Sequence, residues 1–312
     1  MVISKVMAKL RVLLIGCGDV ALRTARLLSA NYRLYGLTRR PDQHAALRAA
    51  GITPIPGDLD RPATLSRLRI SPFAVLHCAP PPATGEIDTR TRNLIAALSS
   101  GRAAGSLPRR FVYISTSGVY GDCRGAHVDE TRVLAPQSAR ARRRVDAEQR
   151  LRRWARGNRM RLSILRAPGI YAEDRLPIER LRAATPALLA EDDVHTNHIH
   201  AGDLAAASRA ALRRGHAQRA YNISDDAEMK MGEYFDLVAD RFHLPRPPRI
   251  ALAEAQRTLP ATLLSFMRES RRLVNARAKR DLRWHPLHAT PGAMLASMEL
   301  PASIKLPEPI AQ

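Results

Sequence analysis

The chain has 312 residues, of which 45% are hydrophobic and 25% charged, and its formal net charge is +21 at pH 7. This length suits one large α/β domain or two smaller ones, and no apolar run reaches the roughly 18 residues of a transmembrane helix. The apolar run near the N-terminus, residues 12–15, is too short for a signal peptide, so we expect a cytoplasmic protein without a membrane partner.

Arginine accounts for the positive charge, since only five of the 50 basic residues are lysines. Alanine is abundant as well, and the GC-rich codons of both residues make a GC-rich genome the simplest explanation. The arginines are spread along the whole chain, and aromatic residues, which many RNA-binding modules use for stacking, make up only 4%. We therefore expect no specific nucleic-acid partner, although the charge predicts weak non-specific binding to polyanions at low salt.

Short apolar runs alternate with helical stretches over the first 165 residues. Strands are predicted over residues 10–16, 32–38, 52–58, 73–79, 109–117 and 160–167. Helices are predicted between them, over residues 19–31, 41–51, 61–69, 87–100 and 137–156. This alternation is typical of a parallel sheet with helices on both faces, so we predict an α/β, Rossmann-like doubly wound fold.

Beyond Pro168 the pattern loosens and prolines multiply. Helices are predicted near residues 203–213, 230–242 and 291–299, separated by irregular segments. We predict an NAD(P)-binding Rossmann domain over residues 1–168. Residues 169–312 would form a smaller, partly helical substrate lobe, with the two parts interleaved.

The first predicted strand ends in a GxGxxA turn, formed by Gly16, Gly18 and Ala21. Glycine at 16 permits a tight turn, glycine at 18 lets the backbone approach a pyrophosphate, and the small Ala21 allows close helix packing. The following helix would present the amides of Asp19 and Val20 to the phosphates. The position of this turn at the first strand-to-helix junction predicts dinucleotide binding over a purely structural turn.

The end of the second strand distinguishes NAD from NADP. Enzymes that use NAD usually carry an acidic residue there for the ribose hydroxyls. This chain has Thr38, Arg39 and Arg40 instead, and two guanidiniums and a hydroxyl suit a 2′-phosphate. We therefore predict NADP over NAD.

Several motifs follow the predicted strands in a characteristic order. They are GDL at 57–59, HCAPP at 77–81, STSGVYGD at 115–122, RAPGIY at 166–171 and HIHAGDLA at 198–205. Together they resemble the extended short-chain dehydrogenase/reductase superfamily, in its NAD(P)-dependent epimerase/dehydratase group, over roughly residues 10–240. The glycine turn departs from the usual GxxGxxG of that family by being one residue shorter.

The resemblance implies further cofactor contacts. Asp58 and Leu59 would flank the adenine, and Ala79 and Pro80 would line the loop beside the pyrophosphate and ribose. The contacts nearest the nicotinamide would be Pro168 and Gly169.

The resemblance also locates the reaction. Thr116 matches the hydroxyl that hydrogen-bonds the substrate oxygen at the reacting carbon. The family's catalytic tyrosine and lysine lie four residues apart on one helix face, and counting back from Glu148 puts arginines in both positions, Arg140 and Arg144. None of the seven tyrosines is followed four residues later by lysine. Arg144 could hold a ribose or pyrophosphate, and Arg140 could bind an anionic substrate.

Helical geometry makes a specific prediction for this helix. Arg140 and Arg144 share a stripe with Ala147, Leu151 and Trp154, which should pack toward the sheet and the cofactor. The other two arginines of the run, at 142 and 143, lie on the opposite side. We therefore expect residues 140 and 144 to be less exposed than residues 142 and 143.

Two more groups of residues bear on the chemistry. The acid pair of sugar-nucleotide dehydratases is replaced by Ser117 and Gly118, so dehydration by that route is not expected. His198 and His200 have no third ligand at a recognisable spacing, and the three cysteines have no metal-ligand or disulfide pattern. No metal is predicted, and the cysteines are expected to be reduced and structural.

These observations leave three hypotheses. The first is an NAD(P)-dependent oxidoreductase or epimerase-like protein, monomeric or homodimeric, acting on an anionic carbonyl or sugar-like small molecule. The candidates for its general acid are Tyr120, Tyr171, His198, His200 and a water relayed by Thr116.

The second hypothesis is a non-catalytic NADP(H)-binding sensor or scaffold, which the arginines in place of tyrosine and lysine favour. The third, a nucleic-acid-binding protein, rests on charge alone.

Overall fold

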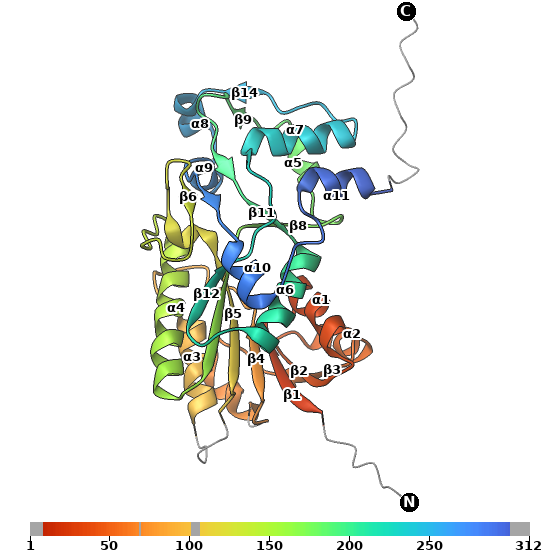
Figure 1. Cartoon of the computed structure of the whole chain (residues 1–312), viewed down its shortest axis with the longest axis vertical. Coiled ribbons are helices and arrows are strands. Elements are labelled where there is room, and N and C mark those ends of the chain that lie inside the picture. Colours follow the sequence, from red (N-terminus) through yellow and green to blue (C-terminus); the bar gives the residue numbers. More distant parts are fainter. Residues whose placement is uncertain (1–8, 69, 101–106, 300–312) are drawn as a thin grey trace, which may run out of the picture.

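The computed structural model describes residues 9–68, 70–100 and 107–299. Its centre is a seven-stranded sheet in the order β12-β7-β5-β4-β1-β2-β3 (Figure 1). Each neighbouring pair of strands is parallel. The strands are β1 (Leu10–Ile15), β2 (Tyr32–Thr38), β3 (Ile52–Pro56), β4 (Ala74–His77), β5 (Arg110–Thr116), β7 (Arg161–Ala167) and β12 (Arg219–Asn222). The predicted Rossmann-like doubly wound fold is confirmed.

Alternation along the strands supplies a hydrophobic core on each face of the sheet. In β1, Val12 and Leu14 belong to one core, whereas Leu13 and Ile15 belong to the other. The first core is covered by α1 (Asp19–Leu28), α2 (His44–Ala49), α6 (Ala201–Arg214) and α10 (Ala276–Leu282). The second is covered by α3 (Thr89–Ser99), α4 (Ala139–Gly157) and the 3-10 helix η2 (Pro62–Arg67). Residues from beyond 168, in α6, α10 and β12, thus complete the sheet and its covering layers.

A second group of elements lies beyond the carboxyl ends of the central strands, at the top of Figure 1. Its helices are α5 (Ile178–Arg182), α7 (Met231–Arg241), α8 (Leu252–Thr258), α9 (Ala261–Met267) and α11 (Pro291–Ser297). Short paired strands accompany them: β8 (Gly169–Tyr171) with β11 (His198–His200), β9 (Ala187–Leu188) with β14 (Arg249–Ile250), β10 (His195–Thr196) with β13 (Met229–Lys230), and β6 (His127–Val128) with β15 (Arg272–Leu273). This lobe has its own apolar cores, one of which contains Tyr234, Phe235 and Met294.

The local differences from the predicted elements follow from proline and from short irregular turns. The helix predicted over residues 41–51 is split into the 3-10 helix η1 (Pro41–Gln43) and α2, and the one predicted over 61–69 is the 3-10 helix η2. Residue 69 lies outside the described residues. Across the described ranges, every helix is too short or too polar to cross a membrane.

Candidate functional site

One cavity of about 400 Å³ opens at the carboxyl ends of β1 to β4. It is lined by twelve of the residues that the sequence predicted for a cofactor: Gly16, Gly18, Asp19, Val20, Ala21, Thr38, Arg39, Arg40, Asp58, Leu59, Ala79 and Pro80. Three others, Arg144, Pro168 and Gly169, are not among its lining residues, although Ile170, which follows Gly169, is. Sequence reasoning did not find the remaining lining residues, which are Cys17, Leu37, Gln43, Gly57, Cys78, Arg90, Ile170 and Arg175.

The two glycines of the turn are needed for different reasons. Gly16 has a φ of +82°, and a Cβ there would lie 2.6 Å from the Cα of Ala79, in the loop after β4. Its lack of a side chain is therefore imposed by the protein's own packing. A Cβ on Gly18 would meet no atom within 4 Å, because this residue faces the cavity. The open space beside Gly18 is where a phosphate group would fit.

The N-terminus of α1 adds an anion-binding feature to this space. Gly18 is the N-cap of α1 and offers no side chain to accept hydrogen bonds from the first turn. The first amides of a helix have no partners within the helix, and the helix dipole gives this end a partial positive charge. An uncapped helix end facing a cavity therefore fits a diphosphate.

The far end of the cavity, beyond β2, is rich in arginine. The hydroxyl of Thr38 donates to Gln43 at 2.9 Å and accepts from the backbone N–H of Arg40 at 3.1 Å. The guanidinium of Arg40 is paired with Asp42 at 2.9 Å. Arg39 is 62% exposed at its side chain and reaches Asp60 only at 3.9 Å, so most of its donors remain available.

Asp60 is held away from Arg39 by a closer partner. Arg90 donates two hydrogen bonds to its carboxylate, at 2.8 and 2.6 Å, and a third to the backbone oxygen of Pro80 at 3.1 Å. The Arg90 hydrogen bonds hold the pKa of Asp60 below its usual range. Arg90, which lines the cavity, thereby joins the loop after β4 to the loop after β3.

Thr116 ends β5 and is partly buried. Its oxygen accepts a hydrogen bond from the backbone N–H of Gly118 at 3.3 Å, which caps the 3-10 helix η3 (Ser117–Tyr120). Because the oxygen acts as an acceptor in this bond, the hydroxyl hydrogen is free of that contact. Thr116 can therefore still donate to a neighbouring oxygen.

A buried polar network stabilises the turn that follows Thr116. The carboxylate of Glu148 in α4 accepts two hydrogen bonds from Arg166 in β7, at 3.2 and 2.7 Å, and one from the hydroxyl of Ser115 at 2.7 Å. Arg166 also donates to the hydroxyl of Tyr120 at 2.9 Å, which in turn donates to Asn222 at 2.7 Å. The side chains of Glu148 and Arg166 are 1% and 4% exposed. The network therefore fixes α4, β5, β7 and η3 relative to one another.

The prediction about the arginines of α4 is wrong for two of the four. Arg143, expected to be solvated, is only 6% exposed, and it donates to the backbone oxygen of Gly85. The loop that follows β4 packs over this part of the helix, and Glu86 in the same loop pairs with Arg142 at 2.9 Å. Arg140, expected to be buried, is exposed, because it lies in the first turn of the helix where it meets the lobe. Helical periodicity contains no information about this covering loop.

Arg140 and Arg144 point to different surroundings. The guanidinium of Arg144 donates to the hydroxyl of Tyr113 at 3.0 Å and to the backbone oxygen of Ile114 at 2.9 Å, so it faces the sheet as predicted. Burial, together with the charge of Arg144, lowers the pKa of the adjacent His77 to about 3. Arg140 instead lies 4.2 Å from the ring centroid of Phe266, which comes from α9 of the lobe.

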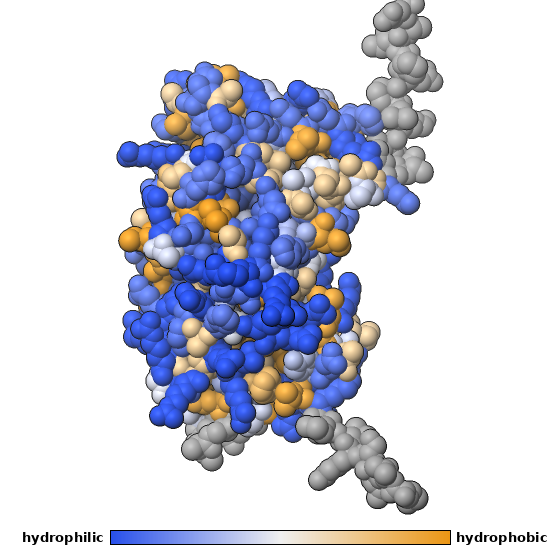
Figure 2. Space-filling view, in the orientation of Figure 1, coloured by the Kyte–Doolittle hydropathy of each residue, from blue (hydrophilic) through white to orange (hydrophobic). Residues whose placement is uncertain are grey.

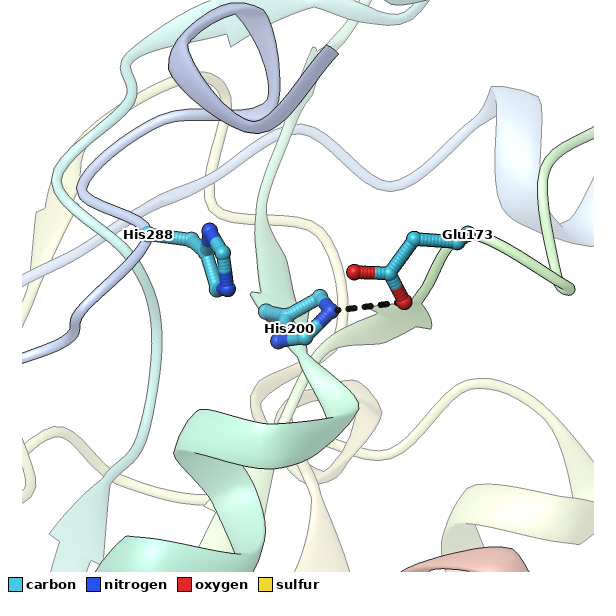
Figure 3. A group of neighbouring side chains, drawn as sticks. All are labelled: Glu173, His200 and His288. Atoms are coloured by element: carbon cyan, nitrogen blue, oxygen red, sulfur yellow. Dashed lines mark hydrogen bonds and ion pairs between the residues drawn. The ribbon is translucent and has the colours of Figure 1, made fainter. Parts of the chain in front are cut away.

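The side chains of Glu173, His200 and His288 lie close together (Figure 3). Their ligand-type atoms are within 4.8 Å of one another, which the sequence spacing of His198 and His200 did not reveal. His200 is the N-cap of α6, and its Nδ1 accepts from the N–H of Gly202 at 3.3 Å. The ring proton is therefore on Nε2, which donates to Glu173 at 3.5 Å. This proton and the positive end of the α6 dipole both oppose a cation at Nε2. We therefore interpret Glu173 and His200 as a hydrogen-bonded tether, with the ring of His288 packed against His200.

Comparison with known proteins agrees with this arrangement. The sequence profile of the NAD dependent epimerase/dehydratase family matches residues 22–224. A functionally unknown conserved protein from Silicibacter pomeroyi is 29% identical, with a TM-score of 0.75, and the match covers 92% of this chain and 96% of that one. The UDP-glucuronic acid 4-epimerase from Bacillus cereus, solved in complex with NAD, is 17% identical, with a TM-score of 0.71 and coverage of 92% and 97%. A search of curated proteins finds no match.

Proposed function

Because the chain belongs to the NAD dependent epimerase/dehydratase family, we propose that it binds NADP in the cavity at the carboxyl ends of β1 to β4. We further propose that it is an oxidoreductase or epimerase-like enzyme acting on an anionic carbonyl or sugar-like substrate. The observation that supports this most strongly is the convergence of twelve predicted cofactor residues on one cavity beside the uncapped end of α1. The preference for NADP is supported by Arg39, whose exposed guanidinium is available for a 2′-phosphate.

The chain's own residues suit a reaction at the end of β5. The bound nicotinamide would supply or accept a hydride there. Thr116 would donate its hydroxyl hydrogen to the substrate oxygen at the reacting carbon, which stabilises the negative charge that develops there. The buried Glu148–Arg166 pair holds the backbone of this turn in place, so the hydroxyl is positioned before substrate arrives.

Arg140 would bind the anionic group of the substrate. Among the described residues its guanidinium makes no hydrogen bond or ion pair, and only the ring of Phe266 covers it. Packing against the lobe shields part of the Arg140 guanidinium from water and lowers its pKa, but an arginine still carries its charge at neutral pH. The positive charges of Arg144 and Arg271 lie close by, with Glu269 as the acidic counterpart. A guanidinium with free donors among other cations is well suited to a carboxylate or phosphate.

The contacts and pKa values of the candidate residues bear on which group supplies the proton to the substrate oxygen. The hydroxyl of Tyr120 is used by Arg166 and Asn222, and burial raises its pKa to about 12. Tyr171 and His198 are buried in the lobe, and burial lowers the pKa of His198 to about 3. His200 is used as a helix cap. A water bound next to Thr116 therefore remains the best candidate.

Kinetics with a panel of paired substrates tests this proposal. NADPH oxidation should be faster with carbonyl compounds that carry a carboxylate or phosphate than with their uncharged analogues. Arg140→Gln should raise KM for the charged substrates about tenfold or more, because a hydrogen-bonded ion pair is lost. Arg142→Gln, the matched control on the same helix, should leave KM unchanged. Equal effects of the two substitutions would contradict the role of Arg140.

A non-catalytic NADP(H)-binding sensor or scaffold is the second candidate. It is favoured by the arginines at 140 and 144, neither of which can act as a general acid near neutral pH. Tight binding of NADPH without turnover across the whole panel would support this second function over the first.

A further inference from the structure

The loop that leaves β8 crosses over to the glycine turn and is tethered at three consecutive residues. Glu173 accepts a hydrogen bond from His200 at the N-cap of α6 (Figure 3). Asp174 pairs with Arg23 of α1 at 3.4 Å, and Arg175 pairs with Asp19 at 3.4 Å. The loop is thus joined to both α6 and α1. It lies directly over the first turn of the helix that follows the glycines.

Arg175 has a special position among these residues because it lines the cavity. Only Ile170 and Arg175 among the described lining residues come from beyond residue 168. Arg23 is not a lining residue, and its Nε is bound to Asp19 at 2.8 Å. Arg175 is therefore the cation of this group that a molecule in the cavity could contact.

Two acidic and two basic side chains are paired beside the glycine turn. Asp19 and Asp174 carry two negative charges, and Arg23 and Arg175 carry two positive ones. Asp19 lies in the first turn of α1, where a diphosphate would bring two further negative charges close to its carboxylate. A cation must then face the diphosphate, or repulsion from Asp19 would weaken binding.

The pair between Arg175 and Asp19 is suited to such an exchange. Its 3.4 Å separation exceeds the 2.7–2.9 Å that is usual for a charge-assisted hydrogen bond. The side chains of Arg175 and Asp19 are 40% and 36% exposed, so solvent screens their attraction. Arg23 remains bound to Asp19 at 2.8 Å and can balance its charge when Arg175 leaves. Losing the weaker contact therefore costs little.

We propose that Arg175 is a diphosphate-binding residue that exchanges Asp19 for the cofactor. This inference rests on the proposed function, since it assumes a dinucleotide in the cavity. Binding of the diphosphate would hold the loop over residues 172–177 against the glycine turn. The tether from Glu173 to His200 keeps this loop attached to α6 in both states.

Calorimetric titration of NADPH and ADP-ribose into the full-length protein tests the proposal without any turnover. Both probes carry the diphosphate. Arg175→Gln should weaken both about tenfold, the loss expected for one charge-assisted hydrogen bond. Arg182→Gln is the matched control, because Arg182 is an exposed arginine of the same lobe that is paired only with Glu179 in the described structure. It removes the same charge and should change either affinity by less than about twofold.

The Asp19→Asn background separates direct binding from positioning. If Arg175 contacts the diphosphate, Arg175→Gln weakens ADP-ribose binding in this background as well, and Asp19→Asn alone strengthens it. If Arg175 serves only as a partner for Asp19, its substitution has no effect once Asp19 is gone, and the proposal is overturned. Equal affinities for Arg175→Gln and Arg182→Gln would overturn it too. Absence of binding by the unsubstituted protein would instead reject the proposed function, and this inference with it.

Discussion

The proposed cofactor site and the proposed reaction site depend differently on backbone and side chains. In the proposed cofactor site, the features that matter are two glycines, a helix N-terminus and the ends of parallel strands. In the proposed reaction site, they are the identities and contacts of single side chains, such as Thr116 and Arg140. The residues of the cofactor site follow from local spacing along the chain. The surroundings of the reaction site depend on which distant segments pack over it.

The largest expected effect is a loss of stability when the buried network of Glu148 and Arg166 is broken. Glu148→Ala should lower the free energy of unfolding by about 3–5 kcal/mol, because the buried Arg166 then has no carboxylate partner. Urea denaturation measures this loss, and the exposed neighbour Gln149→Ala serves as the control. A loss below about 1 kcal/mol for Glu148→Ala would show that the network does not stabilise the turn after Thr116.

The next prediction separates cofactor binding from protein stability at the two glycines of the turn. Gly18→Val should weaken NADPH binding about 100-fold, because the side chain projects into the cavity where a phosphate fits. Stability should change by less than about 1 kcal/mol, since a Cβ at this position meets no protein atom within 4 Å. Gly16→Val should instead destabilise the fold, because its Cβ collides with Ala79 and its φ is positive. Equal stability losses in the two variants would contradict this distinction.

The smallest effect, taken per pH unit, is a dependence of stability on pH at Asp225, where β12 leads into the lobe. Burial raises the pKa of Asp225 to about 8, whereas an unfolded chain has a value near 3.9. The folded state therefore binds more protons between these values. The contribution is fully present below about pH 4 and is lost as pH rises toward 8, by at most about 1.4 kcal/mol per unit. Asp225→Asn should remove this slope in urea denaturation at pH 5 and 7.5. Identical slopes in the two proteins would contradict the raised pKa.

The sequence predicted the fold well because its determinants are local. Apolar runs of strand length and the GxGxxA turn identified β1, α1 and β2 within a few residues. The short strands and helices of the lobe, such as β8 and α9, were not predicted, because they contain too few residues to show a period.

The site was predictable where strand ends meet and not where remote segments meet. Asp58 and Ala79 follow their strands directly, and parallel strands bring such residues to one edge. Arg175 reaches the cavity, and His288 reaches His200, only through the tertiary packing of the lobe. Arg143 is buried by the loop after β4, whose position cannot be predicted from the periodicity of the helix.

The central claim is that the cavity binds a nicotinamide dinucleotide and prefers NADP. Titration of NADPH and NADH into the full-length protein by calorimetry tests it most directly. We predict saturable binding at one site, with NADPH at least about tenfold tighter because Arg39 is available for the 2′-phosphate. Tighter binding of NADH would contradict the preference, and no binding of either would contradict the cofactor site itself.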